Sequence, residues 1–341
     1  VTPLLAVAEV WRAQDASVEF VWIGTPQGPE RGLVEEAGIS FFDLPVARLT
    51  RYVSVEWITL PFKFLIAFFK AVQIIRSQKP DFIGSAGGYT AVPVIFAAKL
   101  LGIPVWVHQQ DVVPILTNRL TAPFASFVTV AWEQNLKSFS KKKTTLVGNP
   151  VRQSVLKGSA DQARETFGLN PDKPVVLIFG GGSGAGWINE TVAEFPKELS
   201  EAANVVHLTG KGKMIGKLDQ IHGDYHALEF VADDMPNVLA AADVVVARAR
   251  LATITELSAL KKAAILVPLP DSPQEANMHA LGDAVVTREQ KDTSPENLFE
   301  TITRLLNDPE QRDVLGEKLG AALDTDAARE IIELLQKQTR S

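Results

Sequence analysis

A run of glycines after a buried strand is the part of this sequence best suited to hold a phosphate. An apolar, β-branched segment, Val175–Phe179, leads into Gly180-Gly181-Gly182-Ser183-Gly184-Ala185 and then into a helix-compatible segment from Trp187. Glycine lets the backbone adopt positive φ and approach a ligand closely. The free N–H groups and positive dipole end of the next helix favour an anion. The motif alone is equally compatible with a turn that only closes a strand–helix unit.

The end of the next strand distinguishes between two kinds of nucleotide. Gly180-x-Gly182-x-x-Ala185 loosely fits a dinucleotide-binding loop, which is accompanied by an acidic residue about 20 positions later. Here the next strand, residues 204–209, ends in Gly210-Lys211-Gly212-Lys213. Two lysines without a carboxylate suit phosphate better than a nicotinamide ribose. The sequence therefore predicts a nucleotide or sugar nucleotide and argues weakly against hydride transfer.

Further polar residues follow later strands in the second half. Residues 227–231 and 243–246 are predicted strands, and Glu256 falls in the first turn or so of the helix after the second one. A carboxylate there can accept two hydroxyls of a ribose or sugar. Gln274 and Asn277 lie three apart on a predicted helix start, so both can face one ligand. A solvated helix face would carry the same residue types, and both interpretations stay open.

The first half contains a second glycine turn. A strand over residues 81–84 leads to Gly87-Gly88-Tyr89 and a helix, and the next strand, residues 105–107, ends at His108-Gln109-Gln110-Asp111. Ligands of open parallel sheets bind beyond the carboxyl ends of the strands, where both segments are expected. A lone histidine at a strand end is more often structural than catalytic. The neighbouring glycine turn nevertheless makes His108 the candidate catalytic residue.

These segments must be positioned by alternating strands and helices, which predict parallel sheets with helices on both faces. The length of 341 residues suggests about two domains. Gly148-Asn149-Pro150 is a turn signal, and the polar stretch over residues 153–174 is predicted to be a loop. We therefore place the domain boundary close to Arg152. The final segment, residues 293–341, is predicted to be helical.

Composition excludes several classes of function. The sequence has no cysteine, which rules out disulfides, a thiol nucleophile and thiolate metal sites and fits a reducing cytosol. Its five histidines are scattered, and we predict no metal site. Val1–Pro150 contains 14 Lys and Arg against 11 Asp and Glu, and the remainder contains 20 against 29. The first half is thus suited to an anionic partner such as a membrane, whereas overall acidity argues against nucleic acid.

One apolar segment has two compatible interpretations. Residues 55–76 are rich in Phe, Trp and Ile, but Pro61, Lys63 and Lys70 make a membrane-spanning helix unsuitable. The segment could bury a wide face in its own domain, or it could lie on anionic lipid. Both interpretations hold if residues 57–64 are the exposed part of the segment. The residues we expect at the membrane are Trp57, Phe62, Lys63, Phe64, Phe68 and Lys70.

In order and spacing, the motifs resemble the bacterial peptidoglycan N-acetylglucosaminyltransferases that convert lipid I to lipid II. The resemblance covers nearly the whole chain. The motifs that carry it are Thr2-Pro3-x-x-Ala6-Val7-Ala8-Glu9, Gly87-Gly88-Tyr89, Gly102-Ile103-Pro104-Val105, His108-x-Gln110, Leu116-Thr117-Asn118-Arg119, Gly148-Asn149-Pro150-Val151-Arg152, Gly180-Gly181 with Gly184-Ala185, Phe230-Val231-x-Asp233-Asp234-Met235, Ala241-Ala242-Asp243, Thr253-Ile254-x-Glu256-Leu257 and Gln274-x-x-Asn277.

This resemblance implies two facing Rossmann-like doubly wound domains of the GT-B type with a cleft between them. Residues 1–152 would bind the acceptor and the membrane. Residues 153–341 would bind UDP-N-acetylglucosamine, with a last helix that could return to the first domain. The implied donor contacts are Phe230 and Val231 to uracil, Glu256 to the ribose, Arg152 and the loop of Gly181, Gly182, Ser183 and Gly184 to the diphosphate, and Gln274 and Asn277 to the sugar.

For the acceptor, the resemblance implies contacts from Gly87, Gly88, Tyr89, His108 and Asn118 to the lipid-linked muramoyl peptide. It also implies an inverting transfer without an essential metal or a separate cofactor, carried out by a peripheral protein at the cytoplasmic face of the plasma membrane. Departing UDP would be stabilised by main-chain amides and by Arg152. The resemblance leaves the general base unassigned.

The sequence departs from the family pattern at several places. The family has a first strand and a Gly-Gly-Thr-Gly-Gly-His loop before the Thr2-Pro3 motif, so we expect that loop to lie outside the 341 residues. Gln109 and Asp111 replace Glu and Asn, and Pro273 replaces His. Ala247-Arg248-Ala249-Arg250 replaces Ser-Arg-Ala-Gly, and Arg250 could block the diphosphate or bind it. An inactive nucleotide-sugar-binding relative, or a transferase for another lipid, therefore remain as alternatives.

Overall fold

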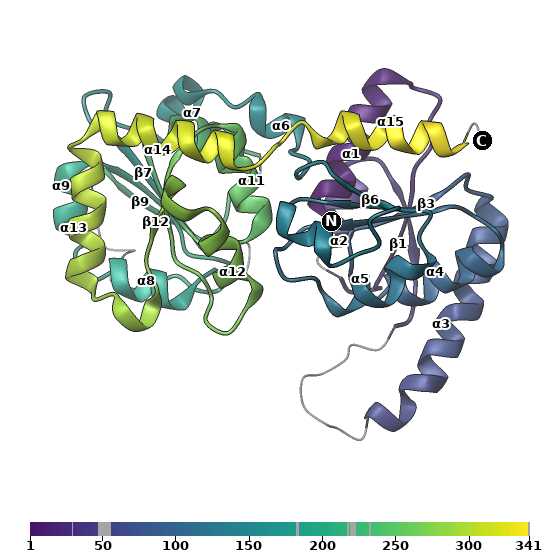
Figure 1. The fold of residues 1–341 in the computed structure, drawn as a ribbon. Helices are drawn as coiled ribbons and strands as arrows, with labels where there is room; N and C mark the ends of the chain where they lie inside the picture. Colours follow the sequence, from purple (N-terminus) through teal and green to yellow (C-terminus); the bar gives the residue numbers. More distant parts are fainter. Residues whose placement is uncertain are drawn as a thin grey trace. The chain divides into compact units, whose positions relative to one another are not determined.

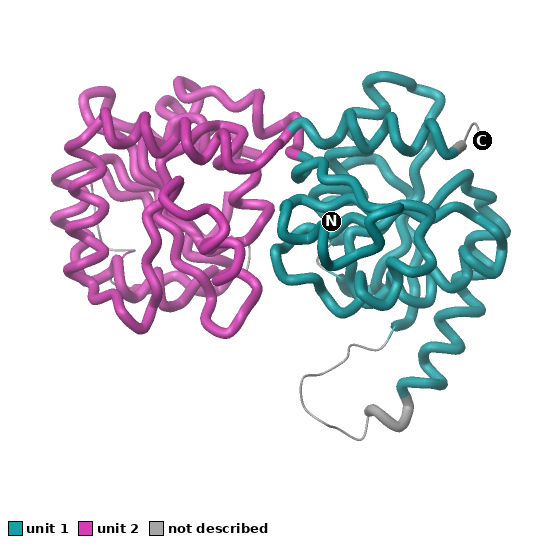
Figure 2. The backbone as a smooth tube through the Cα atoms, viewed as in Figure 1, with its two compact units in different colours: residues 1–150, 326–341 teal, residues 151–325 magenta. Residues whose placement is uncertain are grey.

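The structure is a computed structural model. It describes residues 1–28, 30–46, 56–181, 184–216, 218, 223–231 and 233–339, with the backbone alone for residues 56–59 and 339. The chain divides into two compact units, coloured separately in Figure 2. The first unit joins Val1–Pro150 to the C-terminal Asp326–Ser341, and the second is Val151–Thr325.

The second unit is built on one parallel six-stranded sheet in the order β12-β11-β10-β7-β8-β9. Every residue of its central strand β7 is buried, as expected for a sheet covered on both faces. The strands are β7 (Val175–Phe179), β8 (Asn204–Leu208), β9 (Tyr225–Leu228), β10 (Val244–Ala247), β11 (Ala263–Leu266) and β12 (Val286–Thr287). Successive strands run outward from β7 to β9, and the chain then returns to lay β10 on the other side of β7.

Helices cover both faces of this sheet, with α9 and α13 on one side and α7 and α11 on the other (Figure 1). The helices of the unit are α6 (Gln153–Leu156), α7 (Ala160–Phe167), α8 (Gly186–Val192), α9 (Pro196–Ala202), α10 (Met235–Ala241), α11 (Leu251–Ala259), α12 (Pro273–Ala280), α13 (Pro295–Leu306) and α14 (Pro309–Ala322), with 3-10 turns at Gly282–Ala284 and Gln290–Asp292. The helices α6 and α7 occupy the stretch predicted to be a loop, so that prediction was wrong.

The first unit contains a four-stranded parallel sheet in the order β3-β4-β5-β6 and a separate parallel pair, β1-β2. Its strands are β1 (Val21–Gly24), β2 (Ser40–Asp43), β3 (Ile83–Ser85), β4 (Val105–Gln109), β5 (Phe127–Val130) and β6 (Thr144–Leu146). Its helices are α1 (Thr2–Gln14), α2 (Glu30–Glu36), α3 (Glu56–Gln78), α4 (Ala91–Leu100), α5 (Leu116–Thr121) and α15 (Ala327–Thr339), with 3-10 turns at Ala122–Phe124 and Glu133–Lys137. Both units thus have the predicted parallel α/β architecture.

The C-terminal helix α15 belongs to the core of the first unit. Its Ile331 and Leu335 are buried in one cluster with Val7 and Trp11 of α1. The Trp11 ring also stacks on Phe82 at 5.4 Å between centroids. Packing against α1 therefore ties the last helix to the first one, although they lie at opposite ends of the sequence.

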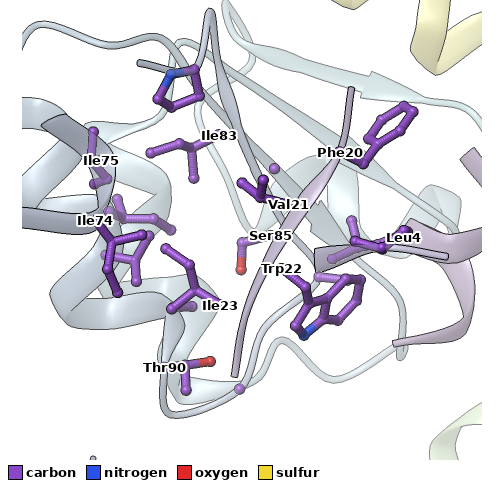
Figure 3. Close-up of a pocket in the computed structure, with 18 of the residues that line it drawn as sticks. Leu4, Phe20, Val21, Trp22, Ile23, Ile74, Ile75, Ile83, Ser85 and Thr90 are labelled. Carbon is purple, nitrogen blue, oxygen red and sulfur yellow. The ribbon is translucent and has the colours of Figure 1, made fainter. Parts of the chain in front are cut away.

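A cavity of about 1530 Å³ separates β1 from β3 (Figure 3). Among the described residues, β1 pairs with β2 only and β3 with β4 only, so each strand presents one open edge. Apolar side chains such as Leu4 of α1 and Ile74 and Ile75 of α3 line the space. Strands from two separate sheets and apolar helix faces thus border one cavity.

The long helix α3 presents one face to the core and another to solvent. Ala67, Ala71 and Ile75 are buried on the inner face, where α3 packs on α4. Among the described side chains of α3, those of Phe62, Leu65, Ile66 and Phe69 are large, apolar and exposed. Within the described residues, no helix combines the length and the apolarity needed to cross a membrane.

Two of the side chains predicted to face a membrane are half-buried. Phe64 stacks on Phe68 and meets Phe96 of α4 edge-on, and Phe68 is packed against the core cluster between α3 and α4. A membrane contact of Phe64 and Phe68 stays a prediction. Phe62, Lys63 and Lys70 are exposed as predicted. The Trp57 side chain lies outside the described residues.

Candidate functional site

The candidate donor residues gather at one edge of the second unit's sheet. All six strands are parallel, so the segments that follow them emerge at the same, carboxyl-terminal edge. The glycine loop follows β7, Phe230 follows β9, Glu256 lies on the helix after β10, and Gln274 lies after β11. The reversal of strand order between β7 and β10 places a topological switch point there, where α/β sheets bind ligands.

The glycine loop needs glycine at several positions for steric reasons. Gly181 and Gly184 have φ of 86° and 65°, and the N–H of Gly184 donates to the carbonyl of Gly181 at 2.7 Å. A Cβ at Gly180 would collide with Ala185, and one at Gly184 would collide with the carbonyl of Thr209. Gly182 and Ser183 lie outside the described residues. At Gly180 and Gly184 the backbone is thus packed too closely for a side chain.

The carboxylate of Glu256 meets the guanidinium of Arg152. Glu256 Oε1 lies 2.9 Å from Arg152 Nη2, and Glu256 is 8% exposed. Burial raises the pKa of Glu256, and the charge and hydrogen bond of Arg152 oppose that rise. The residue sits in the second turn of α11 rather than the first. Arg152 therefore neutralises a buried acid at the position expected for a ribose-binding carboxylate.

Two arginines, Arg248 and Arg250, follow β10. Arg248 is buried and donates through Nη1 to the carbonyls of Val267 and Pro268 at 3.2 and 2.8 Å, so it braces the chain after β11. Arg250 is the N-cap residue of α11, and its guanidinium lies against Gly181. The loops after β7 and β10 are thus in contact at the switch point.

The predicted base- and sugar-binding residues occupy different environments. Phe230 and Val231 lie beyond β9 instead of within it, which corrects the predicted strand over residues 227–231. The Phe230 ring is 48% exposed, and the ammonium of Lys211 lies 5.0 Å from its centroid. Near α12, the side-chain oxygen of Gln274 accepts from the N–H of Leu269, and Asn277 is fully buried. Phe230 is therefore the most accessible of these side chains.

On the acceptor side, Gly87, Gly88 and Tyr89 line one end of the cavity between β1 and β3. Gly87 and Gly88 have φ of 96° and 103°, and the N–H of Gly87 donates to Ser85 Oγ at 3.1 Å. A Cβ on Gly87 would collide with Ile115, whereas Gly88 faces open space. The glycine turn predicted from the sequence therefore does border a hollow of the molecule.

His108 and Asn118 lie behind that turn in the protein interior. Both are fully buried, and Asn118 donates to the His108 carbonyl and to Gln109 Oε1. His108 is part of β4 and does not lie beyond its end, so its predicted position was wrong. In this conformation neither side chain reaches a surface where an acceptor could touch it.

Hydrogen bonds engage both ring nitrogens of His108. Its Nε2 lies 3.0 Å from Asn149 Oδ1 and its Nδ1 lies 2.9 Å from Thr129 Oγ1, which also accepts from the Trp106 indole. Because the amide oxygen only accepts, the proton sits on Nε2 and Thr129 donates to Nδ1. Burial lowers the pKa of His108 to about 4, so the ring is neutral near pH 7.

The second unit repeats this arrangement, and sequence reasoning missed it. His207 of β8 joins Tyr225 Oη at 2.9 Å and Asn189 Oδ1 at 3.0 Å, and burial lowers its pKa to about 4. Asn189 also donates to the carbonyl of Thr209, directly beside Gly184. The available signal was a histidine and an asparagine, each inside an apolar segment. The network fixes α8 against β8 and so supports the glycine loop.

Within the described residues, no group of three or more His, Asp or Glu side chains is close enough to hold a metal ion.

Comparisons with known proteins place the whole chain in one family. Residues 1–130 match the glycosyltransferase family 28 N-terminal domain, and residues 175–334 match the C-terminal domain of the same family. The chain is 36% identical over 344 aligned residues to a UDP-N-acetylglucosamine–N-acetylmuramyl-(pentapeptide) pyrophosphoryl-undecaprenol N-acetylglucosamine transferase of Clostridium kluyveri, covering 99% of this chain and 96% of that protein. A Clostridium botulinum protein of the same name is 32% identical, with 100% and 96% covered.

Solved structures agree with the sequence comparisons. The crystal structure of Acinetobacter baumannii MurG matches with a TM-score of 0.73 and 28% identity, over 98% of this chain and 95% of that one. A UDP-GlcNAc 2-epimerase of Neisseria meningitidis bound to UDP-GlcNAc matches with a TM-score of 0.70 at 16% identity, over 99% and 98%, which shows the shared fold alone. By these similarities, the chain belongs to the glycosyltransferase family 28 group of UDP-N-acetylglucosamine–N-acetylmuramyl-(pentapeptide) pyrophosphoryl-undecaprenol N-acetylglucosamine transferases.

Proposed function

We propose that this protein transfers N-acetylglucosamine from UDP-N-acetylglucosamine to N-acetylmuramyl-(pentapeptide) pyrophosphoryl-undecaprenol, the step that converts lipid I to lipid II. The observation that carries the proposal is the 36% identity to a transferase of that name over 99% of this chain. Two features of the second unit support it. Arg250 lies against Gly181 at a switch point, an edge that suits a nucleotide diphosphate, and Arg152 pairs with Glu256 on the helix that follows β10.

In the proposed reaction, an acceptor hydroxyl oxygen bonds to C1 of N-acetylglucosamine and inverts that centre. The bond from C1 to the diphosphate oxygen breaks, UDP leaves with the electron pair, and the hydroxyl proton passes to a base. Negative charge grows on the departing diphosphate, so the site must offer fixed donors there. Arg152, in the second unit, is a charged donor suited to that role.

We assign the remaining donor contacts on the same basis. Phe230 and Val231 would hold the uracil, with Phe230 offering its exposed ring. Glu256 would accept the ribose hydroxyls while Arg152 holds its charge and faces the diphosphate. Gln274 and Asn277 would bind the sugar, and their present hydrogen bonds and burial imply that α12 must adjust when the donor binds.

The acceptor would enter at Gly87, Gly88 and Tyr89, where the cavity of the first unit opens. The undecaprenyl chain stays in the membrane, so the protein must work at a membrane surface. The exposed face of α3, with Phe62, Ile66 and Phe69 beside Lys63 and Lys70, combines apolar and cationic side chains that suit an anionic lipid surface. We therefore propose peripheral attachment through α3 at the cytoplasmic face.

Transfer from UDP-N-acetylglucosamine labelled in its sugar to lipid I in detergent or vesicles tests the proposal directly. Radiolabel in a lipid-extractable product, with stoichiometric release of UDP, is the expected result. Saturable UDP binding without transfer would instead mark a nucleotide-sugar-binding protein. Transfer to another lipid offered in parallel, such as diacylglycerol, would mark a transferase of different acceptor specificity.

A further inference from the structure

We propose that Arg250 is a diphosphate-binding residue of the donor site and positions the leaving group. The inference rests on the proposed function and adds to it a side-chain contact with the diphosphate. It predicts that the donor is held by the cation of Arg250 at the switch point.

The position of Arg250 follows from the sheet topology. β7 and β10 are neighbours in register, with Phe179 opposite Ala247 at their carboxyl ends. The chain leaves β7 into the glycine loop and leaves β10 toward Arg250, so the two loops flank the point where the strand order reverses. Ligands of doubly wound sheets bind in the crevice at this point.

The contact with Gly181 places the guanidinium over the loop. A Cβ built on Gly181 would lie 3.1 Å from Arg250 Nη1, 3.5 Å from its Cζ and 3.8 Å from its Nε, so the whole group lies along the space that the missing side chain leaves. Gly181 has φ of 86°, which disfavours any replacement. A phosphate placed over Gly181 would therefore lie within reach of a planar, five-donor cation suited to bidentate phosphate recognition.

The local charge supports an anionic ligand. Burial, and then the nearby charge of Arg250, lower the pKa of Arg248 to about 10, so the two guanidiniums repel each other at the end of β10. Arg248 donates to the carbonyls of Val267 and Pro268, whereas the guanidinium of Arg250 lies against Gly181 of the glycine loop. A diphosphate beside Arg250 would relieve this repulsion. α8 has only seven residues and gives limited dipole support, which increases the need for a side-chain cation.

Calorimetric titration of the full chain with UDP and with uridine tests the proposal. The variants are Arg250→Met, which keeps length without charge, Arg250→Lys, and the exposed Arg304→Met of α13 as a matched control. We expect Arg250→Met to weaken UDP binding about tenfold or more and to leave uridine binding unchanged, because only UDP carries the group that the cation binds. The UDP affinity of Arg250→Lys should lie between those of the parent chain and Arg250→Met, and the UDP affinity of Arg304→Met should equal that of the parent chain.

Different results would overturn different statements. If the parent chain binds no UDP and transfers no sugar, the proposed function falls and this inference falls with it. If the parent chain binds UDP and Arg250→Met, with an unchanged melting temperature, binds it equally well, the role of Arg250 alone is refuted. Tighter UDP binding by Arg250→Gly than by the parent chain would also refute it, because Arg250 would then obstruct the crevice.

Discussion

Arg152 and Glu256, separated by 104 residues in the sequence, form an ion pair of 2.9 Å within the second unit. The acid is almost fully buried, whereas the side chain of the arginine is 31% exposed. The arginine lies just before α6 and the acid on α11, so the pair fastens the first segment of the unit to the edge of its sheet. A charge of this kind is costly to bury without its partner.

Replacing Arg152 by methionine should therefore destabilise the second unit by about 1–3 kcal/mol at neutral pH, since a buried carboxylate loses its counter-charge. Burial already raises the pKa of Glu256, and Arg152 limits that rise. In the variant the pKa rises further, so the folded state holds the proton more tightly. The deficit in unfolding free energy should be small near pH 4 and grow as the pH rises through neutrality, as urea titrations at both pH values would reveal.

Glu256→Gln is the matched control for this pair. The amide keeps the volume of the side chain and removes its charge, so the double variant Arg152→Met with Glu256→Gln should recover part of the lost stability and lose the pH dependence. UDP affinity should nevertheless fall in Glu256→Gln, because an amide accepts ribose hydroxyls less strongly than a carboxylate. Unchanged UDP affinity by calorimetry would remove the proposed ribose role from Glu256.

The glycine loop offers a pair of closely matched substitutions. Gly184→Ala would force a methyl group onto the carbonyl of Thr209 at a φ of 65°, and it should cost about 2–4 kcal/mol in stability and weaken UDP binding. Gly186→Ala, two residues later, meets only the Glu190 carboxylate at 3.8 Å and should be neutral or slightly stabilising as the first residue of α8. Equal melting temperatures for the two variants would contradict this view of the loop.

Several features were accessible to sequence reasoning because they depend on local patterns. The buried strand before Gly180 and the glycine run after it predict β7 and its loop without knowledge of any distant residue. Glu256 was placed on the helix after the correct strand. The helix α7 could also have been found, since Ser159 caps its start by accepting from Gln162 and Gly168 ends it with φ of 61°. Reading that polar stretch as a loop overlooked a cap signature at each end.

Other features depend on partners that are far away in the sequence. The sequence alone predicts that His108 lies at the end of a strand. In the structure its ring is buried and bonded to Thr129 and Asn149, which the local pattern does not reveal. From the sequence, Arg250 could equally obstruct the ligand or bind it. The structure adds that its guanidinium lies against Gly181, in the loop after a neighbouring strand. Such contacts are set by the order of strands in the sheet, which local patterns do not determine.

The two buried histidines should make the protein acid-sensitive. Burial lowers the pKa of both His108 and His207 to about 4, whereas an unfolded histidine titrates near 6.5. Below pH 6.5 the two histidines are therefore protonated in the unfolded chain but remain neutral in the folded chain. The free energy of unfolding decreases as the pH falls toward 4. At about 1.4 kcal/mol per pKa unit, each histidine should cost about 2 kcal/mol between pH 7 and pH 5.

Histidine-to-glutamine variants test which unit loses stability at low pH. His108→Gln should flatten the pH dependence of unfolding in the first unit only, and His207→Gln that of the second only, because each ring is enclosed within its own unit. Hydrogen exchange at pH 5 and pH 7 separates the two units. If the double variant keeps the full loss of stability between these pH values, groups other than these histidines cause it. A kcat that follows His108 protonation in a correctly folded enzyme would restore its catalytic candidacy.

The outer face of α3 should govern membrane binding. Replacing Phe62, Ile66 and Phe69 by serine removes three exposed apolar side chains that the core does not use, so stability should be preserved. Binding to vesicles containing anionic lipid should fall at least about tenfold, because each ring or branched chain contributes on the order of 1 kcal/mol when it enters the interface. Lys63→Gln with Lys70→Gln should weaken binding to anionic vesicles and leave binding to neutral vesicles unchanged.

The controls Leu33→Ser and Val314→Ser alter exposed apolar residues on α2 and α14, and these variants should co-sediment with vesicles like the parent chain. Co-sedimentation of the triple variant at the parent level would exclude α3 as the membrane contact, and transfer to a water-soluble acceptor analogue would then show whether the active site is intact.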